Sequence, residues 1–134
     1  MGDYFVKLAI PANTPAEKPV EKAQVVEGEI LDSVAYTVPE GSKNLAHFAV
    51  YYGIKQVYPE AEGEWVGVQI PYRSVKVDWS MPERRLKLSL KAYNEDESYE
   101  HTVYVWLLTK LEEEAKPWKV MADFIAVLKR LIGL

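Results

Sequence analysis

The sequence has no cysteine and only two histidines among its 134 residues. The absence of cysteine excludes a disulfide scaffold and a thiolate zinc site. His47 and His101 stand far apart, without the close spacing that brings metal ligands together on one strand or helix. We therefore expect no metal site and no cofactor, and we interpret both histidines as surface or structural residues.

Positive charge is also scarce, with 16 Lys and Arg against 20 Asp and Glu. Nucleic-acid binding rests on basic side chains that neutralise phosphates, so the net charge of −4 argues against it. The seven glycines form no phosphate-binding motif, and no serine stands in a nucleophile elbow. We expect no catalytic residues and a protein that is not an enzyme.

Long hydrophobic runs are missing as well. The first residues contain neither a basic segment nor an apolar core, so we expect no secretory signal. The C-terminal apolar stretch is short and is interrupted by Lys119, Asp123 and Lys129, which disfavours a membrane span. We expect the protein in the cytoplasm or in a virion. Few Asn and Gln with many Glu and Lys are typical of a thermophilic source.

Short β-strands fill most of the chain. Alternating or β-branched patterns predict strands at residues 4–10, 20–26, 29–38, 48–57, 65–70, 74–79, 86–92 and 102–108. Pro and Gly separate these strands, and Gly53 indicates a bulge or a hairpin inside the fourth. Residues 102–108 are apolar on both faces, which predicts a central strand. The pattern predicts an antiparallel β-sandwich of jelly-roll or immunoglobulin-like topology, but it does not give the strand order.

The last seventeen residues have the pattern of an amphipathic helix. Pro117 suits the first helical turn, and Gly133 suits a helix end. We predict a β-sandwich domain at residues 1–111, an acidic linker at 112–117 and the helix at 118–134. Apolar residues recur every three or four positions along one side of this helix. They are Trp118, Met121, Phe124, Ile125, Leu128, Leu131 and Ile132.

This apolar stripe is the main candidate for function, because its exposure to water is unfavourable. It could cover the protein's own sheet, or it could dock on a partner or on copies of itself, and the sequence weighs these two outcomes about equally. A membrane surface ranks third, because the basic excess of the segment is small. The linker acids Glu112–Glu114 are poor core material, so we expect the helix to stand somewhat apart.

Two other features suggest ligands. Exposed aromatic rings can stack on sugars, and we take Trp65 and Tyr72 as candidate carbohydrate-binding residues. Aromatic residues also fill β-cores, which is the competing interpretation. The acidic segment 94–100 could hold calcium through carboxylate oxygens or could be a solvated hairpin tip, and the sequence does not decide between them.

Three stretches carry a resemblance to a known group. They are residues 10–15 (Ile-Pro-Ala-Asn-Thr-Pro), the segment from Val57 to Trp65, and residues 91–102. Together they resemble small uncharacterised β-sandwich proteins from archaea and from virus or provirus regions, over roughly residues 4–110. The resemblance implies a structural accessory protein, such as a virion surface, head or tail component, and it carries no site residues. The helix lies outside it.

These observations lead to one functional hypothesis and one alternative. The hypothesis is a non-enzymatic structural or interaction protein whose C-terminal helix assembles it with a protein partner or with itself. The alternative is a carbohydrate-binding module that uses the exposed aromatic side chains.

Overall fold

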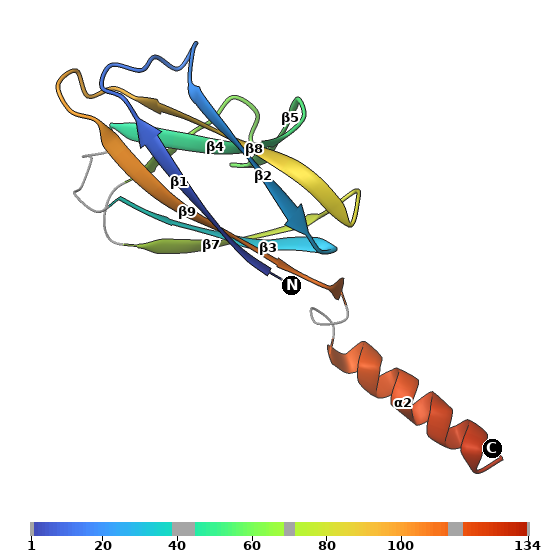
Figure 1. The fold of residues 1–134 in the computed structure, drawn as a ribbon. Helices are drawn as coiled ribbons and strands as arrows, with labels where there is room; N and C mark the ends of the chain where they lie inside the picture. Colours follow the sequence, from blue (N-terminus) through green and yellow to red (C-terminus); the bar gives the residue numbers. More distant parts are fainter. Residues whose placement is uncertain (1, 39–44, 69–71, 113–116, 134) are drawn as a thin grey trace.

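The computed structural model describes residues 2–38, 45–68, 72–112 and 117–133, without the side chains of residues 117–123. Within these ranges, nine β-strands precede a C-terminal helix (Figure 1). The strands are β1 (Gly2–Ile10), β2 (Val20–Glu27), β3 (Ile30–Thr37), β4 (Ala46–Tyr52), β5 (Lys55–Tyr58), β6 (Val66–Val68), β7 (Arg73–Ser80), β8 (Arg85–Asn94) and β9 (His101–Lys110). The helix, α2, spans Pro117–Leu131.

The strands form two antiparallel sheets that pack as a sandwich. One sheet has the order β1-β9-β3-β7, and the other has the order β2-β8-β4-β5 with β6 also paired to β4. First and last strands pair, then second and eighth, third and seventh, and fourth and fifth. Strands from the two ends of the chain pair in nested order, as in one long hairpin, and successive pairs belong alternately to the two sheets. This topology is the jelly roll. The predicted β-sandwich is therefore confirmed, and β9 is central in its sheet.

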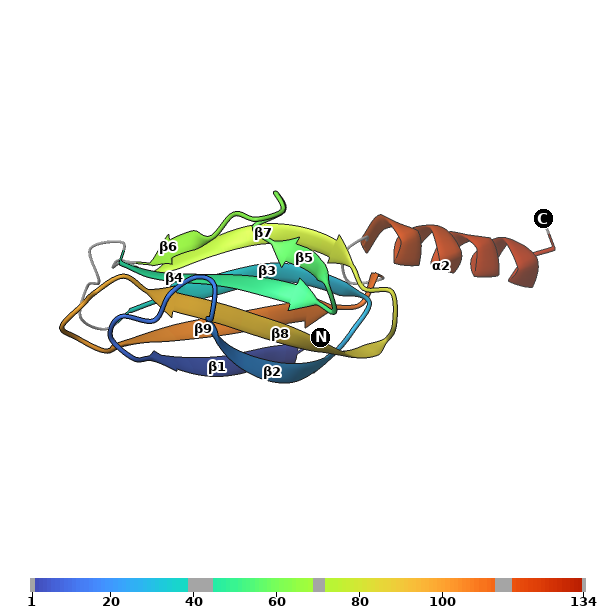
Figure 2. The same ribbon diagram turned by 90° about the horizontal axis from the view of Figure 1, so that it is seen from above.

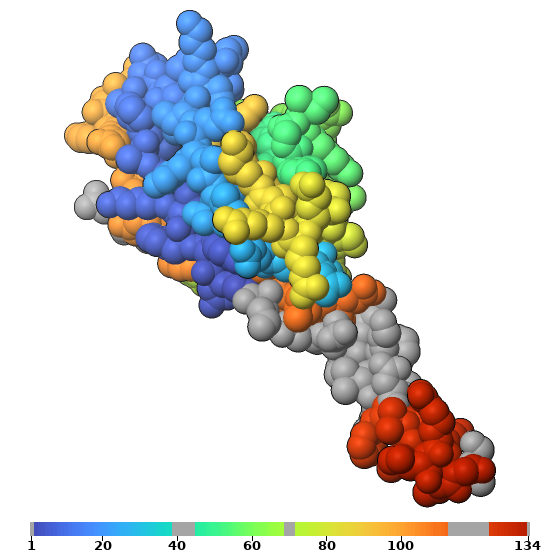
Figure 3. Space-filling model, turned by 45° about the vertical axis from the view of Figure 1, so that its right-hand side comes forward, coloured from blue at the N-terminus to red at the C-terminus, as the bar shows by residue number. Residues whose placement is uncertain are grey.

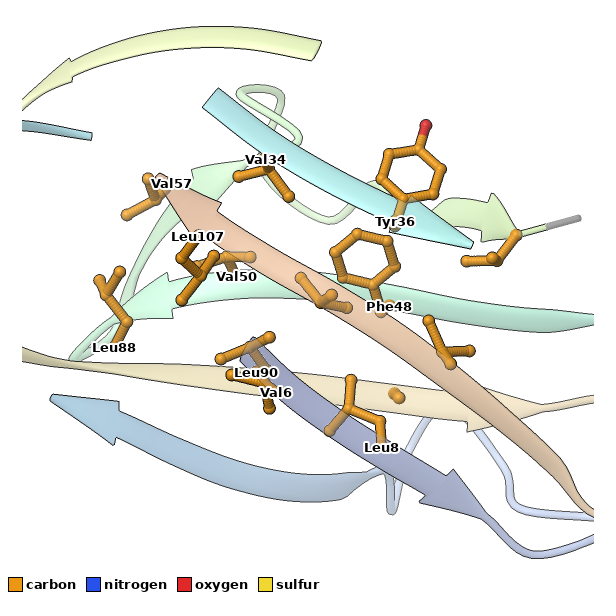
Figure 4. Close-up of a cluster of buried hydrophobic side chains, with 14 of the residues drawn as sticks. Val6, Leu8, Val34, Tyr36, Phe48, Val50, Val57, Leu88, Leu90 and Leu107 are labelled. Carbon is orange, nitrogen blue, oxygen red and sulfur yellow. The ribbon is translucent and has the colours of Figure 1, made fainter. Parts of the chain in front are cut away.

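The core lies between the two sheets and follows the predicted alternation. Leu86, Leu88 and Leu90 of β8 are buried, whereas Arg85 and Lys87 are exposed. Val103, Val105 and Leu107 of β9, in the opposite sheet, are buried in the same core. Figure 4 shows Leu107 together with Leu88 and Leu90 between the strands. Because side chains alternate between the faces of a strand, each sheet keeps a second face outside the core. Those outer faces, together with the helix, are the surfaces available for function.

Two aromatic rings mark the centre of this core. Tyr36 of β3 and Phe48 of β4 meet edge to face, with ring centroids 5.1 Å apart. Both are buried, and Figure 4 shows their rings side by side between the sheets. Tyr58 of β5 lies next to them. Its burial, and to a smaller extent a hydrogen bond with Tyr36, raises the pKa of Tyr58 far above the ordinary value of a phenol. The ring of Tyr58 is partly buried and packs against the core.

The hairpin predicted around Gly53 is present. Gly53 has a φ of +60° between β4 and β5, a left-handed conformation that glycine adopts without strain. Pro11, Pro15 and Pro19 enclose the loop after β1, and proline has no N–H to donate to a strand ladder. Thr14 in that loop nevertheless bridges to Asn94, whose backbone N–H donates to the Thr14 carbonyl at 3.0 Å. Neighbouring prolines do not prevent this bond, because the Thr14 carbonyl accepts it and no proline N–H is needed.

Helix α2 begins at Pro117 as expected and stops close to the expected glycine. Gly133 has a φ of +77° and donates its N–H to the carbonyl of Arg130, which closes the last turn. Figure 2 shows α2 projecting beyond one end of the sandwich, in line with the expectation that it stands apart. In the ranges that the structure describes, no helix has the length and apolar character needed to cross a bilayer.

Candidate interaction surfaces

The helix presents an apolar face that the described parts of the chain leave uncovered. We call Phe124, Ile125, Leu128, Leu131 and Ile132 the apolar helix face. Their exposed fractions run from 43% for Leu128 to 77% for Leu131. Figure 3 shows this end of the molecule extending away from the sandwich. The sequence weighs packing on the protein's own sheet and docking on a partner or another copy about equally. The described part of the sheet does not cover these five residues.

Trp118 and Met121 belong to the same predicted stripe, but their side chains lie outside the described part of the chain. Their spacing still places them on the side of α2 that carries Ile125 and Leu128, because three or four residues make about one helical turn. The linker residues 113–116 are also outside the described ranges. The predicted linker is therefore visible only as Glu112 on one side and Pro117 on the other.

An ionic cluster stabilises the end of the sandwich from which the helix emerges. Between Leu31 and Ser33, β3 has one extra residue, Asp32, relative to β9, and at the same place its register also shifts against β7. The Asp32 carboxylate accepts a hydrogen bond from Lys76 of β7 and lies 2.7 Å from the Lys110 ammonium of β9. Hydrogen bonds with Lys110 and then Lys76 hold the pKa of Asp32 below its ordinary value of 3.8. Asp32 therefore links β3, β7 and β9 at the end of the sandwich that lies nearer the helix.

A surface hollow of about 710 Å³ lies beside this cluster. Its charged lining consists of three cationic residues, Lys76, Arg84 and Lys110, and three anionic residues, Glu29, Asp78 and Glu112. Because the two signs balance, and Lys76 and Lys110 already contact Asp32, the hollow offers no concentrated charge to a ligand. We do not assign a site to it.

The outer face of the β1-β9-β3-β7 sheet carries a cluster of aromatic rings, which we call the Phe5 face. Phe5 on β1 lies opposite Trp106 on β9, with ring centroids 5.2 Å apart, and it also contacts Tyr104 at 5.6 Å. Tyr72, just before β7, meets Trp106 edge to face at 5.6 Å. Phe5 and Tyr72 are each more than half exposed. These four rings form a contiguous aromatic surface open to solvent.

A second aromatic cluster lies on the outer face of the other sheet. His47 of β4 stacks on Tyr93 of β8 with ring centroids 4.5 Å apart, and Trp65 meets Tyr93 edge to face at 4.8 Å. Nearby on the same two strands, Lys91 lies over the ring of Tyr51, 4.6 Å from its centroid. Trp65 is partly buried in this arrangement. Its ring is therefore less available to a ligand than the rings of the Phe5 face.

The two aromatic residues singled out from the sequence do not form one site. Tyr72 belongs to the Phe5 face, whereas Trp65 belongs to the cluster around Tyr93 on the opposite outer face. Sequence reasoning missed Phe5, Tyr104 and Trp106. The alternation of β1 already placed Phe5 on the side away from Tyr4 and Val6, and that was the signal available to find it.

The acidic segment 94–100 is not simply a solvated tip. Asn94 is 1% exposed, and its side-chain amide donates to the carbonyls of Tyr99, Ile10 and Pro11 at 2.9, 3.3 and 3.4 Å. Its side-chain oxygen accepts from the backbone N–H of Asp96 at 2.9 Å. Asn94 thus fastens the β8–β9 loop to the end of β1. Glu95 and Glu97, in contrast, are exposed as a tip would be.

One carboxylate of this loop, that of Asp96, is engaged by the loop backbone and by His101. Asp96 accepts the backbone N–H groups of Ser98 and Tyr99 and lies 2.9 Å from the His101 ring nitrogen. The hydrogen bond from the backbone of Ser98 is the main cause that lowers the pKa of Asp96, and the hydrogen bond from His101 is the second. With both oxygens engaged, Asp96 has little capacity left for calcium, which needs six to eight oxygen ligands.

The two histidines each contact a different acid of the same loop. His47 Nε2 lies 2.9 Å from a Glu95 carboxylate oxygen, at angles that fall short of a hydrogen bond, and His101 contacts Asp96. A metal site would require both rings and a carboxylate to converge. Within the residues that can be placed, no group of three or more His, Asp or Glu side chains is arranged to hold an ion.

Comparisons with known proteins add little beyond the fold. The sequence matches no protein-family model and no curated protein sequence. Among solved structures, the fold is similar to that of FLHE, at 10% identity and a TM-score of 0.38, over 79% of this chain and 94% of that one. It is also similar to part of a family two carbohydrate esterase from Cellvibrio japonicus, at 8% identity and a TM-score of 0.33, over 79% of this chain and 34% of the esterase. Likenesses this slight do not bear on function.

Proposed function

We propose that the protein is a non-enzymatic structural or interaction protein, in which α2 anchors the jelly roll to another protein molecule. One observation carries the proposal: the apolar helix face is exposed, and no part of the described sandwich covers it. Burial of a large apolar side chain contributes about 1.5–3 kcal/mol, so five such side chains strongly favour a covered state. We infer that the covering surface comes from another molecule.

The sandwich is suited to act as the rigid body of such a component. Its buried core extends from Val6 to Leu107 and, among the side chains that the structure describes, includes none from α2. An assembly role in a virion agrees with the jelly roll, which occurs in viral capsid proteins as well as in lectins and cupins. The fold alone does not choose among these roles, so the proposal rests on the exposed helix and not on the jelly roll.

The test compares the full chain with a chain that ends at Glu112, which keeps the last sandwich contacts. We expect both to unfold in the same sandwich transition, because the core is the same, and only the full chain to associate or bind a partner. Light scattering and thermal unfolding measure the two properties. An equal monomeric mass for both chains, with a large loss of melting temperature on shortening, would make the helix an ordinary part of the fold.

A second candidate function is carbohydrate binding by the Phe5 face. Phe5 and Tyr72 flank Trp106 and are more than half exposed, so their rings are available to stack on a sugar. Retention by immobilised polysaccharides tests this candidate. We expect Tyr72→Ala to weaken retention about two- to tenfold, since one ring contact is worth about 0.5–1.5 kcal/mol. Tyr99→Ala is the control, because Tyr99 is also more than half exposed but lies in the β8–β9 loop. No retention of the unchanged protein would eliminate this candidate.

A further inference from the structure

The apolar residues of α2 follow a heptad. From Trp118 the steps to Met121, Ile125, Leu128 and Ile132 are three, four, three and four. This spacing defines the seam of a coiled coil, in which each side chain inserts among four residues of a facing helix. The helix Pro117–Leu131 supplies the backbone that the pattern needs. The seam is complementary to another copy of itself.

The apolar surface is wider than a two-stranded seam. At 100° per residue, Phe124, Leu131, Val120 and Val127 extend the seam on one side until apolar residues occupy half of the helix circumference. The other half carries Lys119, Ala122, Asp123, Ala126, Lys129 and Arg130. A helix in a dimer covers little more than the seam, whereas a helix in a larger bundle packs on two neighbours. The helix is also only about 22 Å long, so it needs this wider contact.

Charge favours copies of the chain over a lipid surface. Anionic membranes attract helices whose polar side has a clear basic excess. The helix segment 118–134 has three basic residues against one acidic, which is a small excess, and the acids Glu112–Glu114 lie a few residues before the helix. Residues 112–134 together therefore contain four acidic and four basic residues, and their attraction to anionic lipid is weak, whereas a heptad seam needs no net charge.

Resting on the proposed function, we propose that the occupant of the apolar helix face is the same helix from other copies of this chain, in a bundle of at least three. The sandwiches then stand at the outside of the bundle, each joined to it through the segment after β9. Such an arrangement would present several copies of the Phe5 face from one particle, which increases binding to any repeated ligand.

Sedimentation equilibrium of the full chain tests the bundle with two matched variants. Leu128→Asp places a charge in the seam, and Ala126→Asp places the same charge in the polar half, two residues away. We expect a mass of at least three times 15.3 kDa for the unchanged protein and for Ala126→Asp, and 15.3 kDa for Leu128→Asp. A dimer, or a monomer at every concentration, would overturn the bundle.

Further measurements separate this failure from failure of the proposed function. If the unchanged protein is monomeric and Leu128→Asp melts like Ala126→Asp, the bundle is wrong, but the helix is still free to bind a different partner. If Leu128→Asp alone lowers the melting temperature of the monomer, the helix belongs to its own sandwich and both proposals fail. Dissociation by Phe5→Lys would place the helix on a neighbour's sheet, and sedimentation with phosphatidylglycerol vesicles would place it on lipid. Either result overturns the bundle.

Discussion

The side-chain amide of Asn94 donates a hydrogen bond to the backbone carbonyl of Tyr99 at 2.9 Å, across the loop between β8 and β9. The same side chain is almost completely buried and also contacts the end of β1. One polar residue thus closes a loop and ties it to a strand more than eighty residues earlier in the chain. Buried polar groups of this kind are costly to leave unpaired.

Replacement of Asn94 by leucine should therefore destabilise the fold although leucine is more hydrophobic. The change leaves the carbonyl of Tyr99 and the N–H of Asp96 without their partner, and each unsatisfied group costs about 1–3 kcal/mol. We expect a loss of about 2–4 kcal/mol in urea unfolding. Glu97→Leu is the matched control, because Glu97 is exposed in the same loop. An equal effect of both variants would contradict the role of Asn94.

Acid should destabilise the sandwich in part through Asp96. Its pKa in the folded protein lies below the ordinary value of 3.8, so the folded state holds the ionised form more strongly than the unfolded state does. This contribution is fully present above about pH 4 and is lost as the pH falls through the folded pKa. Melting temperatures measured from pH 7 down to pH 2 should fall less steeply for Asp96→Asn than for the unchanged protein. Glu97→Gln should retain the full slope, and a parallel curve for Asp96→Asn would count against this account.

Two phenylalanines on strands of opposite sheets should differ sharply in their effect on stability. Phe48 is fully buried against Tyr36, so Phe48→Ala should cost about 3–5 kcal/mol. Phe5 is about half exposed, and Phe5→Ala should cost only about 1 kcal/mol, mainly through its contacts with Trp106 and Tyr104. Chemical unfolding measures both values. A cost for Phe5→Ala near that of Phe48→Ala would mean that the Phe5 face is covered in the native protein.

Much of the fold can be predicted from local pattern. The alternation of Leu86, Leu88 and Leu90 with exposed residues identifies a strand with one buried face, and the two-sided apolar character of 102–108 identifies the central strand β9. The nested strand order cannot be predicted in this way. Pairing of β1 with β9 joins residues about one hundred positions apart, and alternation states which face is buried but not which strand lies alongside.

The candidate surfaces show a similar division. The apolar helix face follows directly from its spacing, because a helix repeats every 3.6 residues whatever lies around it. The burial of Asn94 cannot be predicted from spacing, because the segment of Asn94, Glu95 and Asp96 has the composition of a solvated turn. Asn94 is buried because the end of β1, far away in the sequence, packs against it in the folded protein. Likewise, Trp65 and Tyr72 are seven residues apart, yet the chain crosses from one sheet to the other between them.

The central claim is that another molecule, and not the protein's own sandwich, covers the apolar helix face. Hydrogen–deuterium exchange of the full chain, measured over a dilution series, tests it most directly. We predict that amides of residues 124–131 lose protection on dilution while those of β9 keep theirs, because the bundle dissociates and the core does not. Protection of 124–131 that equals that of β9 at every concentration would contradict the claim.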